Sequence, residues 1–132
     1  MDLVEWTSAF IDNLNSYKRD LEKKEINGNI IECMYNGKGS VKYIVEPELK
    51  EEVMDKLQGS VVLVCLNKKE NLVFMAKNWD NFIKNSKLKV IFSNPKANQQ
   101  WSLIPYVHNK ICEPASLRLG LKSIFESVPE IS

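Results

Sequence analysis

Cysteine, histidine and arginine are all scarce in this chain of 132 residues. The three cysteines, Cys33, Cys65 and Cys112, are an odd number, lie far apart and form no CxxC pair, so the sequence predicts neither disulfide bonds nor a zinc site. His108 is the single histidine. Only two arginines are present, and this scarcity of forked guanidinium groups argues against sequence-specific DNA binding.

Long apolar runs and a targeting segment are also missing. The longest uninterrupted apolar run, Val61 to Leu66, has six residues, far short of the roughly twenty that a membrane-spanning helix needs. Asp2 and Glu5 stand where a signal peptide would carry basic charge. We therefore expect no membrane partner and a cytoplasmic location.

Nucleotide-binding motifs and a strong net charge are absent as well. Neither the Walker pattern nor GxGxxG occurs, so we expect no cofactor, and a net charge of +1 gives no general attraction for nucleic acid. Tyr35, Tyr43 and Lys42 could form a stacking platform for a single strand of nucleic acid. Aromatic pairs on neighbouring strands are at least as often simple sheet stabilisers, so we expect no nucleic-acid partner.

The composition, with 44% hydrophobic and 27% charged residues, fits one α/β domain over residues 1–132. From Leu3 to about Lys24, apolar residues recur at helical spacing and predict one long amphipathic helix. The runs IIECMY and SVKYIVE flank NGKG, in which Gly37 and Gly39 can supply positive φ, and this pattern predicts a hairpin.

The stretch after Ser60 predicts a parallel βαβ unit. VVLVCL (61–66) and LKVIF (88–92) lack alternation, which is typical of strands covered on both faces. The segment 71–84 between them could return as a strand, but its apolar spacing favours a helix capped by Asn71. The residues on that helical stripe are Leu72, Met75, Ala76, Trp79, Phe82 and Ile83.

Prolines mark the remaining elements. Pro47 is expected to open a helix that Gly59 closes, and Pro105 restricts WSLIPYV to an edge strand. Pro114 opens a last helix that Pro129 ends. The predicted order is α-β-β-α-β-α-β-β-α, with a mixed sheet and helices on both of its faces.

The predicted sheet also indicates where a ligand would bind. Ligands of such sheets sit outside the carboxyl ends of parallel strands, here next to the loops 67–70 and 93–100. The first loop leads into a helix N-terminus, which favours a phosphate or carboxylate, although ordinary solvent-facing loops are the more common case. The residues expected to contact a small anionic ligand are Lys68, Lys69, Asn71, Asn94 and Lys96.

His108 is the candidate catalytic residue. In an extended segment, Tyr106, His108, Lys110 and Cys112 would share one face. A Cys–His pair can act as nucleophile and base, but four residues along a strand separate these side chains by about 13 Å. We therefore favour a structural histidine over a catalytic one.

Two E-x-K patterns, at Glu22–Lys24 and Glu48–Lys50, match an element of nucleases of the PD-(D/E)xK type. That element needs a central strand and a preceding aspartate to hold a divalent cation, whereas both matches are expected on helices. The sequence therefore predicts neither this nuclease chemistry nor a metal site.

The sequence favours a non-catalytic binding or protein-interaction module. The alternative is a small enzyme that acts on an anionic substrate, with His108 as acid or base. Self-association through the N-terminal helix is a third possibility, because Val4 and Trp6 widen its apolar face.

Overall fold

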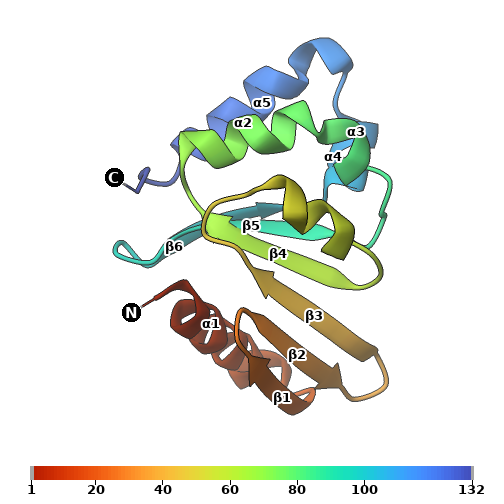
Figure 1. Cartoon of the computed structure of the whole chain (residues 1–132), viewed down its shortest axis with the longest axis vertical. Helices are drawn as coiled ribbons and strands as arrows, with labels where there is room; N and C mark the ends of the chain where they lie inside the picture. Colours follow the sequence, from red (N-terminus) through yellow and green to blue (C-terminus); the bar gives the residue numbers. More distant parts are fainter. Residues whose placement is uncertain (1, 132) are drawn as a thin grey trace.

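The structure, a computed structural model, describes residues 2–131 and has one six-stranded mixed sheet with helices on both faces (Figure 1). The strands are β1 (Leu21–Asn27), β2 (Ile30–Tyr35), β3 (Gly39–Val45), β4 (Val61–Leu66), β5 (Lys89–Asn94) and β6 (Gln99–Leu103). The helices are α1 (Leu3–Lys18), the 3₁₀ helix η1 (Glu51–Lys56), α2 (Lys69–Lys77), α3 (Trp79–Phe82), α4 (Pro105–Ile111) and α5 (Pro114–Glu126).

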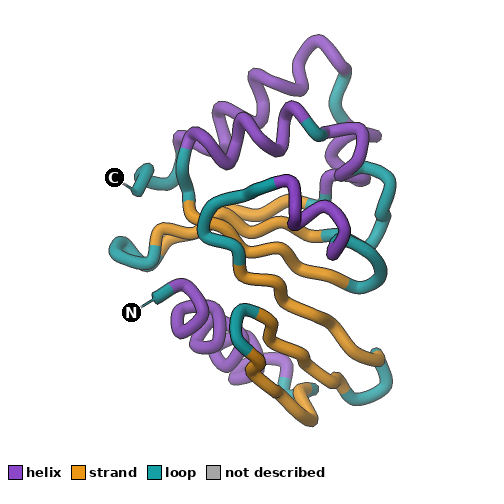
Figure 2. Tube along the Cα trace, in the orientation of Figure 1, coloured by secondary structure: helices purple, strands orange, loops and turns teal. Residues whose placement is uncertain are grey.

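The strands lie in the sheet in their chain order, and Figure 2 shows this succession in one layer. β1, β2 and β3 form an antiparallel meander, β3, β4 and β5 run parallel, and β6 returns antiparallel to β5. The predicted α/β class and mixed sheet are confirmed. The βαβ unit is confirmed too, since β4 and β5 are adjacent, parallel and joined through α2 and α3.

The N-terminal helix is shorter than its sequence pattern predicts. A capping box between Asp2 and Glu5 starts α1, but the helix ends at Lys18 because Arg19 takes a left-handed conformation with φ 51°. The next residues form β1, which pairs with β2 through a turn at Gly28, where φ is 62°. The prediction of a helix to Lys24 is therefore wrong, since pairing with β2 outweighs the helix-favouring charged residues of this segment.

Alternate residues of the strands face two separate apolar layers. One layer lies under α1, and its buried residues are Leu3, Trp6, Ile11, Ile31, Cys33, Tyr43, Val45, Val62, Val64 and Ile91. The opposite face of the sheet carries η1, α2, α3 and α5, which cover β4 and β5 most completely. Trp6 is only 5% exposed, so the expectation that it widens an uncovered helix face is wrong.

Three further predictions change, two of them next to prolines. The helix expected after Pro47 is the short η1, and both Pro47 and Gly59 lie outside it. The helix over 71–84 is confirmed but divides into α2 and α3 at Asn78. WSLIPYV is an edge strand only to Leu103, because Pro105 starts α4 instead of continuing the strand.

The last helix is confirmed as α5, which begins at Pro114 and packs Leu121 and Phe125 into the core. Within residues 2–131, none of the helices combines the length and the apolar character that crossing a lipid bilayer requires.

Candidate functional site

The carboxyl ends of β4 and β5, where a ligand is expected, are covered by the chain itself. Asn67 directly follows β4, and its side-chain Nδ2 donates to the carbonyl oxygens of Val128 at 3.0 Å and Pro129 at 3.2 Å. Asn94, the last residue of β5, donates to the same Pro129 oxygen at 2.9 Å. The backbone N–H of Ile131 donates back to the Asn67 carbonyl at 3.0 Å. Residues 128–131 therefore lie across this end of the sheet.

Both ends of the Asn67 side-chain amide are bonded to partners within the chain. Its Oδ1 accepts the indole N–H of Trp101 at 2.7 Å, while its amide group serves the two carbonyls above. Trp101 in turn stacks on Phe92, with ring centroids 4.3 Å apart. Because Asn67 is fully buried and its partners are all within the chain, its role is structural.

Asn71 is expected to cap a helix and contact a ligand. In the structure it is buried, and its side chain links two loops by hydrogen bonds. Its amide donates to the carbonyls of Pro47 and Leu66, both at 2.8 Å, and its Oδ1 accepts the backbone N–H of Leu49 at 2.8 Å. The capping position of α2 belongs to Lys68. The cap prediction for Asn71 is therefore wrong, because Asn71 is the third residue of α2 and its side chain bonds the backbone of the two neighbouring loops.

The N-terminus of α2 does hold an anion, and the anion is the chain's own Glu130. The backbone N–H of Lys69 donates to Glu130 Oε2 at 3.1 Å, an arrangement that the free N–H groups and dipole of a helix start favour. Lys68 pairs with Glu48 at 3.3 Å. The adjoining cavity of about 560 Å³ is lined by Glu48, Leu49, Lys50, Lys68, Glu70, Asn71, Glu130 and Ile131. Its three carboxylates outnumber its two lysines, which disfavours an external anion.

Lys96 lies in the turn between β5 and β6, so it is on the same end of the sheet as Lys68 and Lys69. That turn projects from the body of the molecule beside the C-terminal segment (Figure 1). The structure thus brings all five expected ligand residues to one end of β4 and β5, although Lys96 lies apart from the other four on the projecting turn.

His108 lies on α4, and Cys112 is the residue that directly follows this helix. Since helical residues four apart are neighbours, His108 Nε2 is only 3.5 Å from Cys112 Sγ, and the separation expected for an extended segment is wrong. The imidazole and the ring of Trp79 are nearly perpendicular, with centroids 6.3 Å apart. α4 follows Leu103, which pairs with Val90 at the amino end of β5. His108 is therefore at the opposite end of β5 from the loop lysines.

The two E-x-K patterns do not assemble a metal site. Lys24 lies on the edge strand β1 and binds Ser8 and Asp12 of α1, both at 2.7 Å. The helix expected for Glu22–Lys24 is thus replaced by a strand, and Glu48–Lys50 precedes η1. Across residues 2–131, no group of three or more potential His, Cys, Asp or Glu ligands is close enough to hold a metal.

The tyrosines considered for nucleic-acid stacking belong to the layer under α1. Tyr43 is buried and Tyr35 is partly buried against that layer. Burial raises the pKa of both phenols. Their rings are therefore not available as a stacking platform.

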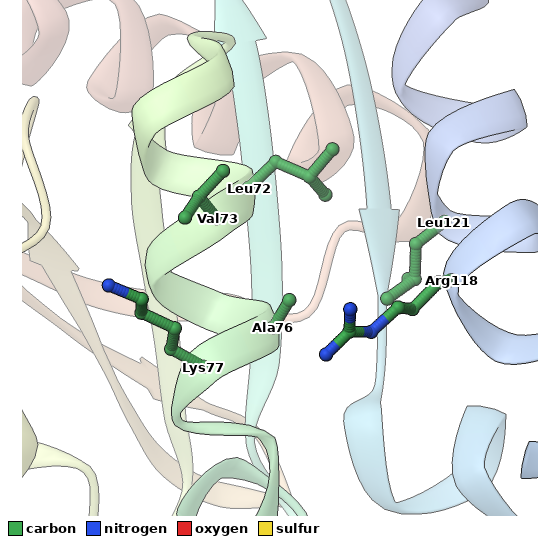
Figure 3. A pocket seen from close by; sticks show the side chains of 6 residues that line it. All are labelled: Leu72, Val73, Ala76, Lys77, Arg118 and Leu121. Atoms are coloured by element: carbon green, nitrogen blue, oxygen red, sulfur yellow. The ribbon is translucent and has the colours of Figure 1, made fainter.

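A groove between α2 and α5 is the feature that sequence reasoning missed (Figure 3). Its volume is about 340 Å³, and it is lined by Leu72, Val73, Ala76, Lys77, Arg118 and Leu121. Leu72 and Ala76 point from α2 toward α5, while Arg118 reaches from α5 toward α2. Two features of the sequence could have indicated this groove. Ala76 is a small residue among large ones on the apolar stripe of α2, and Arg118 follows Leu117 of the predicted apolar face of α5.

Comparison of the chain with protein-family models, with curated proteins and with solved structures finds no match.

Proposed function

We propose that the protein is a non-catalytic interaction module, and that the α2–α5 groove binds an amphipathic segment of a partner protein that carries an acidic side chain. The observation that supports this proposal is an apolar groove flanked by two cations, Arg118 and Lys77. Neither cation takes part in an ion pair within residues 2–131.

The walls of the groove suit the apolar side chains of a partner. Val73 is 44% exposed and Leu72 and Ala76 are partly exposed, so a partner side chain seated between the helices removes their apolar surface from water. Leu121 lines the groove from α5 and is buried at 3% exposure. An amphipathic helix docked in a groove uses this kind of contact, with anchor residues spaced by one helical turn.

The charge on the groove selects the partner. A guanidinium group can take a carboxylate through two parallel hydrogen bonds, and the surrounding apolar surface strengthens such a contact by excluding water. Arg118 points into the groove, and Lys77 lies on the exposed side of α2 next to it (Figure 3). An apolar segment with a glutamate or aspartate beside its anchors complements this surface.

The alternative function, an enzyme acting on an anionic substrate, has less support. Its binding loops and its proposed acid or base, His108, lie at opposite ends of β5. The helix N-terminus expected to bind the substrate holds Glu130.

The test is an NMR titration with a model helical peptide that has leucines one turn apart flanked by glutamates. The expected result is shifts confined to the methyl groups of Leu72, Val73, Ala76 and Leu121. The matched peptide with lysines in place of glutamates should bind at least about tenfold more weakly, because two cations then face like charge. Absence of methyl shifts with the acidic peptide would contradict the proposal.

Two variants locate the contact. Ala76→Trp fills the groove and should abolish the shifts, whereas Arg118→Glu should reverse the preference between the two peptides. Lys87→Glu makes a similar change of charge on an exposed turn outside the groove and serves as the control. Equal responses of Arg118→Glu and Lys87→Glu would show that general charge, and not the groove, determines binding.

A further inference from the structure

The three cysteines of the chain have different surroundings. Cys33 and Cys65 are completely buried on opposite faces of the sheet, and burial raises the pKa of both thiols. Cys112 follows α4 and is partly exposed. It is therefore the thiol of the three that reagents in solution can reach.

Cys112 is also the thiol with a base beside it. His108 Nε2 lies 3.5 Å from Cys112 Sγ, and the backbone N–H of Cys112 donates to the carbonyl of His108 at 3.1 Å, which fixes the two residues one helical turn apart. With its proton on Nδ1, the imidazole presents Nε2 to the thiol as a hydrogen-bond acceptor.

The imidazole is held in this position from two other elements. The ring of Trp79 on α3 meets it edge to face at 82°, and Trp79 is itself fixed by a hydrogen bond from its Nε1 to Asn109 Oδ1 at 3.0 Å. On the α5 side, a Cβ placed on Gly120 would lie 4.0 Å from His108 Nε2. Gly120 therefore faces the nitrogen that is next to Cys112 Sγ. Two uncharged residues, Trp79 and Gly120, therefore flank the imidazole of the His108–Cys112 pair.

We propose that Cys112 is a reactive thiol with His108 as its general base, and that it exchanges with low-molecular-weight disulfides. The Cys112 proton passes to His108 Nε2, and the sulfur attacks one sulfur of the disulfide. The S–S bond of the reagent breaks, a new S–S bond joins Cys112 to one half, and the other half leaves as a thiol with the proton from the imidazolium. Cys112 is oxidised and one half of the reagent is reduced.

This site is separate from the α2–α5 groove. Neither His108 nor Cys112 lines the groove, and thiol exchange needs no protein partner. The two proposals can therefore fail independently.

The test is the rate at which oxidised glutathione modifies each cysteine at neutral pH, followed by mass spectrometry of the intact chain and its peptides. The native chain is compared with the same chain unfolded in urea, where each thiol has its ordinary reactivity. Partial burial alone would slow Cys112, whereas an adjacent base should make it at least about tenfold faster than in the unfolded chain. Cys33 and Cys65 should stay unmodified in the native chain, as internal controls.

Variants separate the base from the helix. His108→Gln keeps a helix-favouring side chain and should lower the native rate to that of the unfolded chain or below. Val107→Ala changes an exposed residue of the same helix that does not position the imidazole, and it should leave the rate within about twofold.

A native rate no higher than the unfolded rate would overturn the proposal, and so would an unchanged rate in His108→Gln or an equal loss in Val107→Ala. If His108→Gln does not fold by circular dichroism, His108→Asn takes its place, and the comparison of native with unfolded wild-type chain decides without any variant.

Discussion

Two regions of the molecule border α2. One is the crevice at the carboxyl ends of β4 and β5, formed by Asn67, Asn94 and the start of α2, and the other is the α2–α5 groove. They differ in whether the chain itself supplies partners for their polar and charged groups. At the crevice, Asn67, Asn94 and the start of α2 are matched by carbonyls and a carboxylate from residues 128–131. At the groove, Arg118 and Lys77 have no ionic partner within residues 2–131, and apolar surface is left exposed. Polar side chains near a sheet end can therefore serve stability, while the less polar groove leaves open the surface on which we propose that a partner binds.

The difference follows from the cost of burying polar groups. A buried amide or N–H without a partner costs about 1–3 kcal/mol, so a crevice of buried asparagines is stable only when it is closed. Arg118 is exposed and stays hydrated without a partner, so the groove can remain open at little cost.

The largest expected loss of stability comes from a change in the hydrophobic core beneath the crevice and the groove. Trp79 is 8% exposed and belongs to the core cluster that also contains Met75 of α2 and Leu121 of α5, so Trp79→Ala should lower the free energy of unfolding by about 3–5 kcal/mol. Urea denaturation measures the change, with Val73→Ala on the exposed side of α2 as control. A loss within about 0.5 kcal/mol would mean that the helical layer does not depend on Trp79.

The next effect tests whether the crevice is closed. Asn67→Ala removes the bonds to Val128 and Pro129 and leaves the Trp101 indole N–H without its partner, so it should cost about 3 kcal/mol. Asn36→Ala, at an exposed turn, is the control and should change stability by less than about 0.5 kcal/mol. Equal denaturation midpoints for the two variants would show that residues 128–131 do not close the crevice in solution.

The sequence predicts the central part of this fold well and its ends less well. The continuous apolar run at Val61–Leu66 matches β4 residue by residue, because a strand buried on both faces needs apolar side chains at every position. β1 was missed because Lys24 owes its position to Ser8 and Asp12 of α1, contacts that a local pattern does not contain.

The candidate sites show the same limit. Two polar loops correctly indicated one end of the sheet, but nothing local to them could show that Glu130 occupies the start of α2. The pairing of His108 with Cys112 depended on whether Pro105 ends a strand or starts a helix, and proline is compatible with both. The groove needs α2 and α5 side by side, which only the tertiary fold provides.

A smaller effect concerns α5, whose Arg118 and Leu121 form one wall of the groove. Gly120 has an ordinary negative φ, and a methyl group there would lie at van der Waals distance from His108. Gly120→Ala should therefore raise the free energy of unfolding by about 0.5–1 kcal/mol, because alanine loses less backbone entropy in a helix. Thermal and urea melts measure the gain. A destabilised variant would show that α4 and α5 pack more closely at this point than the contact distance indicates.

The smallest expected loss of stability is that of Glu130→Gln, which tests whether the crevice excludes anions. Glu130→Gln keeps a hydrogen-bond acceptor for Lys69 N–H but removes the negative charge at the start of α2, so it should cost about 0.3–1 kcal/mol at low ionic strength and less at high salt. Glu52→Gln on η1 is the control for loss of an exposed carboxylate. Inorganic phosphate, titrated by calorimetry, should not bind the wild-type chain at this place, since the carboxylate already occupies it. If Glu130→Gln costs nothing and the wild-type chain binds phosphate through Lys68 and Lys69, the crevice is an open anion site, and the contrast with the groove no longer holds.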